Sequence, residues 1–199
     1  MKKTHHAATA FLAALSLALL PGCAFVQRHH PVPRYEIPDA PAPATEATPA
    51  NAGDGEAVAV GKVRAAPEAA GRILRAVDVA TGRSAPVAGW ELATPAEAIV
   101  AGRLRERLSA ERPGALVFDA SMAPRGKAAA LVECWIETFR VEKREGGWFF
   151  AFKADLFETA ADGKTAGRRI AAETKIADPG REPPPEKVVR AIAETLQGL

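Results

Sequence analysis

The strongest constraint on the fold of this chain is an alternation of apolar and polar side chains on both sides of a glycine turn. Apolar residues occupy every second position from Ala130 to Ile136, as they do on the buried face of a β-strand. Glu145-Gly146-Gly147 predicts a tight turn, and the alternation resumes from Trp148 to Leu156. A hairpin of this kind buries only one face, so other parts of the chain must cover it.

The alternation shifts by one position inside the first strand. Phe139 has the opposite parity to Ile136, and a β-bulge near Thr138 would return both to the same face. A weaker alternation through residues 170–176 predicts a third strand after a second turn. We therefore expect residues 130–176 to form an antiparallel meander with one apolar face.

Two amphipathic helices are predicted outside this meander. Thr94, Pro95 and Glu97 have the spacing of a capping box at the start of a helix that extends to Leu108. A second helix is predicted over residues 186–196, where apolar residues again recur at helical spacing. Together these elements predict an α+β fold, a two-layer sandwich of mainly antiparallel sheet with both helices packed on one face.

The N-terminus has the pattern of a bacterial lipoprotein signal peptide. A basic start is followed by an apolar run that is shorter than the roughly 20 residues of a membrane-spanning helix. The residues expected to be recognised by lipoprotein signal peptidase are Leu20, Pro21 and Gly22. Residues 1–22 are then removed, and Cys23 carries a diacylglycerol and an N-acyl (palmitate-type) chain. No other cofactor is expected.

The residue after the cysteine bears on the destination of the protein. Ala24 follows Cys23, where an aspartate would favour retention in the inner membrane. We therefore expect a lipid-anchored protein of the outer membrane that faces the periplasm. The alternative is an ordinary secretory signal in which the cysteine occurs by chance.

Proline and alanine dominate the segment after the cysteine. Residues 23–70 contain scattered prolines that interrupt helices and strands, and this composition predicts a flexible linker. Residues 71–199 are expected to form one globular domain. About 45 residues of extended linker would span up to about 150 Å.

Charge and cysteine content argue against a nucleic-acid partner and against a disulfide bond in the domain. The formal net charge is +2, and Lys2 and Lys3 leave with the signal peptide, so the mature chain is close to neutral. Without a block of lysine or arginine, no nucleic-acid partner is expected. The chain has two cysteines, and if Cys23 is lipidated then Cys134 has no partner for a disulfide.

The predicted domain offers no familiar catalytic site. Cys134 falls on the apolar face of the central strand, which predicts a core residue rather than a reactive thiol. Glu133, Glu137 and Asp155 are expected on the wet face of the sheet rather than in a catalytic pair. The histidines of the chain all precede the domain: His5, His6, His29 and His30. We therefore expect a protein that is not an enzyme.

Aromatic side chains are the natural contact points for a partner or a lipid. The candidates for such a surface are Trp90, Trp135, Trp148 and Phe150. The alternation equally allows Trp148 and Phe150 to lie on the core face of their strand, where no binding role is needed.

Several features occur in an order typical of one family of envelope lipoproteins. These are Cys23, Tyr35-Glu36-Ile37, Trp90-Glu91 ahead of the helix at 94–108, the strands at 132–139 and 148–156, and the helix at 188–196. In this layout the chain resembles the ABC-type transport auxiliary lipoproteins, the PqiC-like group. The resemblance implies a mixed α/β fold and a role beside ABC transporters and MCE-type proteins, which move lipids or organic solvents between the two membranes.

Two non-enzymatic functions follow. The first is an accessory lipoprotein of an ABC/MCE-type transport system that binds lipid or protein partners, with an MCE-type protein or an ABC permease as the expected partner. The second is an activator lipoprotein for envelope assembly or a cell-wall synthase, and a long linker suits such a role. An enzyme would instead require a cleft with convergent polar groups.

The lipobox interpretation predicts the effect of a single substitution. Cys23→Ser should release the protein from the membrane without unfolding it, because the lipid chains are the expected anchor. Membrane fractionation measures the release, and circular dichroism of the released protein checks its fold. Continued membrane association after the substitution would contradict the interpretation.

Overall fold

The computed structural model describes residues 31–38, 57–122, 129–180 and 182–199. All the elements described below belong to one compact unit, Val32–Leu199. The strands are β1 (Arg34–Tyr35), β2 (Ala57–Ala65), β3 (Arg75–Asp78), β4 (Arg83–Pro86), β5 (Glu91–Leu92), β6 (Leu116–Asp119), β7 (Ala130–Arg144), β8 (Gly147–Ala160) and β9 (Thr165–Ala177). The helices are α2 (Ala96–Glu111) and α3 (Pro185–Gln197), with a short 3-10 turn, η2 (Ala120–Met122).

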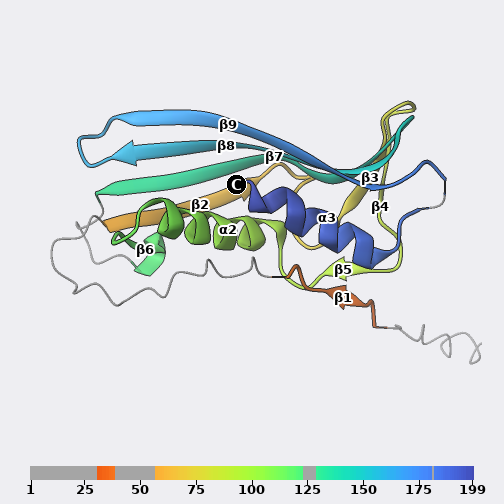
Figure 1. Ribbon diagram of the computed structural model, residues 1–199, viewed down its shortest axis with the longest axis horizontal. Helices are drawn as coiled ribbons and strands as arrows, with labels where there is room; N and C mark the ends of the chain where they lie inside the picture. The colour runs from red at the N-terminus through yellow and green to blue at the C-terminus, as the bar shows by residue number, and fades with distance from the viewer. Residues whose placement is uncertain (1–30, 39–56, 123–128, 181) are drawn as a thin grey trace, which may run out of the picture. The chain divides into compact units, whose positions relative to one another are not determined.

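The predicted meander forms one side of the main sheet, with β7 in the middle of the sheet and β9 at its edge (Figure 1). β7 pairs antiparallel with β8, and β8 pairs antiparallel with β9. The predicted bulge is confirmed, because the ladder between β7 and β8 steps from Ile136 to Thr138 and leaves Glu137 between two paired residues. The extra residue returns Phe139 to the buried face that Ile136 occupies.

The turn between β7 and β8 requires glycine for a steric reason. Gly147 has a φ of +127°, a conformation that side-chain-bearing residues rarely adopt. A Cβ atom on Gly147 would also collide with the carbonyl oxygen of Ala177 at the end of β9. A larger residue at position 147 would therefore push the turn away from the end of β9.

The second edge of β7 carries two parallel strands. β2 pairs with the first half of β7 and β3 with the second half, and both run parallel to it. β6 continues the sheet in parallel beside β2, and β4 pairs antiparallel with β3. The sheet is therefore mixed, although its longest pairings are antiparallel. The predicted α+β two-layer sandwich is confirmed.

The position of β2 corrects the predicted linker. Residues 57–65 form a strand inside the segment predicted to be flexible, so the boundary at residue 70 is wrong for this part. Val58, Ala59 and Val60 are buried because β2 lies between β6 and β7. By composition alone, these small side chains do not distinguish a strand from a linker. Their burial depends on pairing with β6 and β7. The rest of the predicted linker, apart from residues 31–38 and 66–70, lies outside the described residues, as does the signal peptide.

Both helices cover the same face of the sheet (Figure 1). Beneath them the ring of Phe139 lies edge-on to two others, with centroids 5.0 Å from Phe150 and 6.4 Å from Phe152. Leu104 of α2 and Ile192 of α3 are fully buried against this cluster. Edge-to-face pairs add about 0.5–1.5 kcal/mol to the effect of area burial. No helix within the described ranges is long and apolar enough to cross a bilayer.

The start of α2 differs from the prediction. The helix begins at Ala96 with Pro95 as its N-cap, and no side chain caps it, so the capping-box prediction is wrong. The carboxylate of Glu97 instead accepts a hydrogen bond from the backbone N–H of Gly71 at 3.0 Å. Glu97 thus ties the loop before β3 to the helix.

Residues 33–38, which we term the strap, are held against the domain. β1 pairs in parallel with β5, and the backbone N–H of Ala93 donates to the carbonyl of Tyr35 at 2.8 Å. The Tyr35 ring lies edge-on to Trp90 at 5.5 Å, and its hydroxyl donates to Glu186 of α3 at 3.3 Å. The Arg103 guanidinium of α2 donates to the carbonyl of Pro38. The strap is therefore part of the domain rather than of a free linker.

The assignment of sheet faces predicts unequal costs for two substitutions in β8. Phe150→Ala should lower the free energy of unfolding by about 3–5 kcal/mol, because it leaves a cavity in the core. Phe157→Ala, on the exposed face of the same strand, should cost about 0.5–1 kcal/mol. Urea unfolding followed by circular dichroism measures both. Equal losses would contradict the assignment.

Candidate functional site

The aromatic candidates for a binding surface are mostly core residues. Trp90, Trp148 and Phe150 are 5%, 8% and 0% exposed, so the prediction of a surface role is wrong for these three. Trp148 and Phe150 lie on the core side of β8, and the ring of Trp90, in the loop before β5, packs edge-on against Tyr35. Trp135 is 41% exposed on the opposite side of the sheet. The predicted lipid-attachment residue Cys23 and the recognition residues Leu20, Pro21 and Gly22 lie outside the described residues.

The groups considered for catalysis are placed in ordinary structural roles. Cys134 is a buried core residue, as predicted, and burial raises the pKa of its thiol to about 12. The carboxylates of Glu137 and Asp155 both pair with Arg169 of β9, at 3.4 and 2.9 Å. Glu133 lies opposite Phe157 in the ladder. Within the described ranges, no three histidine, cysteine or acidic side chains cluster closely enough to hold a metal ion.

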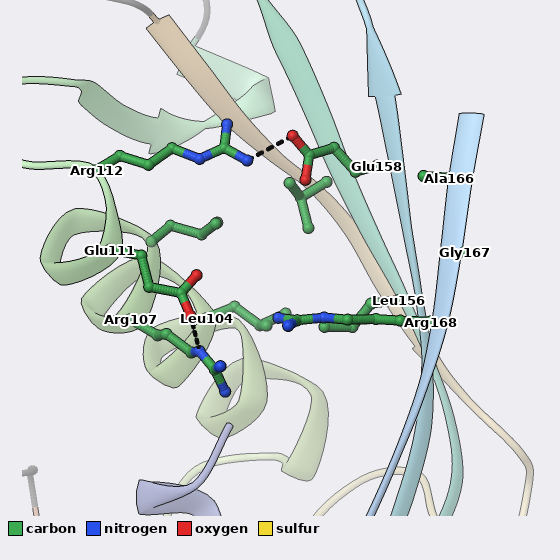
Figure 2. Close-up of a pocket in the computed structure, with 11 residues that line it drawn as sticks. Leu104, Arg107, Glu111, Arg112, Leu156, Glu158, Ala166, Gly167 and Arg168 are labelled. Atoms are coloured by element: carbon green, nitrogen blue, oxygen red, sulfur yellow. Dashed lines mark hydrogen bonds and ion pairs between the residues drawn. The ribbon is translucent and has the colours of Figure 1, made fainter. Parts of the chain in front are cut away.

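A cavity of about 310 Å³ lies between α2 and the sheet, and we term it the α2–β9 pocket (Figure 2). α3 packs on the C-terminal part of β9, where Thr195 donates a hydrogen bond to Thr174 at 2.7 Å. The first residues of β9 extend beyond the end of α3 (Figure 1). The pocket forms there, between the C-terminal half of α2 and the ends of β8 and β9.

The floor of the α2–β9 pocket is apolar. Its buried side chains are Leu104 and Leu108 of α2, Val132 of β7 and Leu156 of β8. The two leucines are four residues apart and so share one face of the helix, as the sequence pattern indicates. The pocket therefore has a floor of hydrocarbon side chains, each at most 5% exposed.

Charged side chains surround this floor. Arg112, the residue that follows α2, forms an ion pair of 2.5 Å with Glu158 of β8 across the pocket. Arg107 pairs with Glu111 at 2.5 Å and donates to the carbonyl of Gly198 at 2.9 Å. The pairs are drawn in Figure 2.

Arg168 of β9 completes the charged wall. Its side chain points into the pocket toward α2 (Figure 2). Unlike those of Arg107 and Arg112, the guanidinium group of Arg168 forms no ion pair or hydrogen bond with any described residue. The wall thus carries three guanidinium groups against two carboxylates. Sequence reasoning missed this site, although the position of Arg168 on the core-facing parity of β9, opposite Leu156, was a usable signal.

The opposite face of the sheet contains a buried acid held by two arginines. Glu142 is 6% exposed, and its carboxylate accepts hydrogen bonds from Arg140 at 3.0 Å and from Arg144 at 2.9 Å. Arg144 also pairs with Glu173 at 2.8 Å and lies over the ring of Phe149, 5.0 Å from its centroid. Burial raises the pKa of Glu142, but the hydrogen bonds and charges of Arg144 and Arg140 outweigh it and hold this pKa below its ordinary value.

Comparison with known proteins identifies the fold. No protein-family model and no curated protein matches the chain. The crystal structure of an uncharacterized protein is similar at 16% identity, over 72% of this chain and 86% of that one, with a TM-score of 0.59. Protein XCC0632 from Xanthomonas campestris, of the family DUF330, is similar at 13% identity, over 72% and 77%, with a TM-score of 0.57. At these identities the likeness shows a shared fold alone.

A third solved structure is less similar in fold. Lipoprotein GNA1162 from Neisseria meningitidis is 10% identical over 72% of this chain and 99% of that one. Its TM-score of 0.35 is too low to support an argument.

The Glu142 network predicts a pH-dependent stability difference. Because the folded pKa is lowered, the stabilisation is fully present above the ordinary carboxylate pKa and is lost as the pH falls through the folded value. Glu142→Gln should therefore lower the unfolding free energy by roughly 1–3 kcal/mol at pH 7 and by progressively less under acid conditions. Urea unfolding at pH 7, 5 and 3 measures the difference. Glu145→Gln in the exposed turn is the control, and a loss independent of pH would contradict the prediction.

Proposed function

We propose that this chain is a membrane-anchored accessory lipoprotein of an ABC/MCE-type system that transports lipids or organic solvents, and that it acts by binding lipid or protein partners. It catalyses no reaction. The fold shared with a DUF330 protein is consistent with the resemblance to PqiC-like lipoproteins. In this proposal, lipids on Cys23 anchor the protein, and Ala24 after the cysteine favours the outer membrane, with the domain facing the periplasm.

The α2–β9 pocket is the observation that carries this proposal. An apolar floor next to several guanidinium groups suits a molecule with a hydrocarbon part and a polar end, which is the chemistry of a membrane lipid. The groups that could serve as nucleophile or base are poorly suited to that role. The thiol of Cys134 is buried, and the carboxylates of Glu137 and Asp155 are neutralised by Arg169.

The strap supports this function over the alternative of a far-reaching activator. With residues 33–38 fixed to the domain, the tether is only the stretch from Cys23 to Arg34. A stretch of this length spans at most about 35–40 Å, not the roughly 150 Å of a free linker. Residues 39–56 connect the strap to β2 and add nothing to the tether. A domain held this close to the membrane suits exchange of lipid with that membrane.

Site-specific photo-crosslinking in native membranes tests the proposal. A photoreactive amino acid at Trp135, on the exposed sheet face, and another at Glu111, beside the pocket, should recover an MCE-type protein or an ABC permease, identified by mass spectrometry. A photoreactive residue at Ile192, inside the core, is the control and should recover no partner.

Two other outcomes would count against transport. Recovery of a murein synthase or an outer-membrane barrel protein would favour the activator function instead. Recovery of none of these proteins from either exposed position would contradict both functions.

A further inference from the structure

We propose that the α2–β9 pocket binds one hydrocarbon chain of an anionic lipid, with the anionic end held by Arg168. The inference rests on the proposed function only in taking a membrane lipid as the ligand. The proposed function already takes this pocket as a lipid site, and the inference adds which part of the lipid enters it and which residue holds the anionic end.

The charge argument depends on the difference between Arg168 and its two neighbours. Arg107 and Arg112 already have carboxylate partners at 2.5 Å, so an incoming anion would have to compete with Glu111 and Glu158 for them. Arg168 has no such partner among the described residues. A guanidinium group binds carboxylate or phosphate oxygens through paired N–H donors. An anion at Arg168 therefore gains an ion pair without breaking one.

The apolar floor decides between a lipid and a free inorganic anion. Leu104, Leu108, Val132 and Leu156 line the cavity. A phosphate ion at Arg168 would leave the cavity above these side chains filled with water, whereas a hydrocarbon chain would replace that water with apolar contacts. The ligand that satisfies both parts of the site is an amphiphile, with its chain on the floor and its anionic end at the wall.

The size of the cavity favours a single chain. Its volume of about 310 Å³ is at the lower end of the roughly 300–1,000 Å³ of small-molecule sites. Such a space takes one chain or part of one, and the remainder of a two-chain lipid would stay outside.

The edge of the sheet provides an entrance. β9 pairs only with β8 among the described strands, so its other edge borders the opening of the pocket. Ala166 and Gly167, which line the pocket there, are exposed and have little or no side chain. A chain can therefore enter sideways past β9 without displacing a large residue.

Calorimetric titration of the Cys23→Ser chain, purified without detergent, tests the inference. The probe is sodium dodecanoate below its micelle concentration, and it should bind at one site per chain. Arg168→Ala should weaken this binding at least tenfold. Arg169→Ala is the matched control, because Arg169 is the next residue and faces the opposite side of the sheet, and it should leave the affinity unchanged.

A second pair of variants distinguishes binding in the pocket from nonspecific binding of dodecanoate elsewhere on the protein. Ala166→Trp should block the cavity and abolish binding. Ala171→Trp, on the outer face of the same strand, should bind dodecanoate like the parent chain. Circular dichroism confirms that each variant is folded, and a loss of binding in both or in neither would overturn the inference.

Other ligands identify what the site recognises. Inorganic phosphate and uncharged monododecanoylglycerol should each bind at least tenfold more weakly than dodecanoate. If phosphate bound as tightly as dodecanoate, the site would recognise only an anion. If the uncharged lipid bound as tightly, Arg168 would not contribute to binding. Either result would overturn the inference. Binding of an acidic amphipathic peptide in place of dodecanoate would also overturn the inference, since it would make the pocket a protein-docking site.

The two proposals can fail separately. Absence of dodecanoate binding, with an MCE-type protein or ABC permease recovered by crosslinking, overturns the ligand site and leaves the accessory function intact. Dodecanoate binding without recovery of any transport protein would support the ligand site and contradict the transport function.

Discussion

Burial of one face of the long strand β7 is the constraint on which the rest of this structure depends. β7 pairs with β8 along one edge and with β2 and β3 in succession along the other, so every part of the main sheet is positioned from it. The bulge at Glu137 allows both halves of the strand to direct apolar side chains at α2 and α3. Without this extra residue, Phe139 would face solvent and the charged Arg140 would face the helices.

The α2–β9 pocket follows from how the two helices divide the sheet between them. α3 covers the C-terminal part of β9, and α2 lies over β2 and the ends of β7 and β8. The start of β9 lies beyond the end of α3, and a pocket with an apolar floor remains between it and α2. The same geometry directs Arg168 into the opening, because its parity is that of the buried residues although no helix covers it. Arg168 thereby adds a guanidinium group to the charged side chains that surround the apolar floor.

The strap and the pocket constrain the function jointly. The strap joins the domain immediately before α2, and the pocket lies at the other end of that helix, whose 16 residues extend about 24 Å. Fixing residues 33–38 to the domain shortens the proposed tether to a few tens of ångströms. Under the proposed function, a tether of this length would keep the domain near the membrane that holds Cys23, and that membrane would be the source of lipid for the pocket.

Local periodicity in the sequence determined the meander, its bulge, the two helices and the core position of Cys134, because each depends on residues a few positions apart. Tertiary structure alone decided the rest. Val58 and Val60 sit in an alanine-rich segment whose strand character depends on β6 and β7, which come much later in the chain. Trp148 looked equally suited to a surface and a core until the helices covered its face. Arg168 meets Leu104 and Leu108 only because α2 packs over that end of the sheet, and burial between distant elements has no signature in short-range spacing.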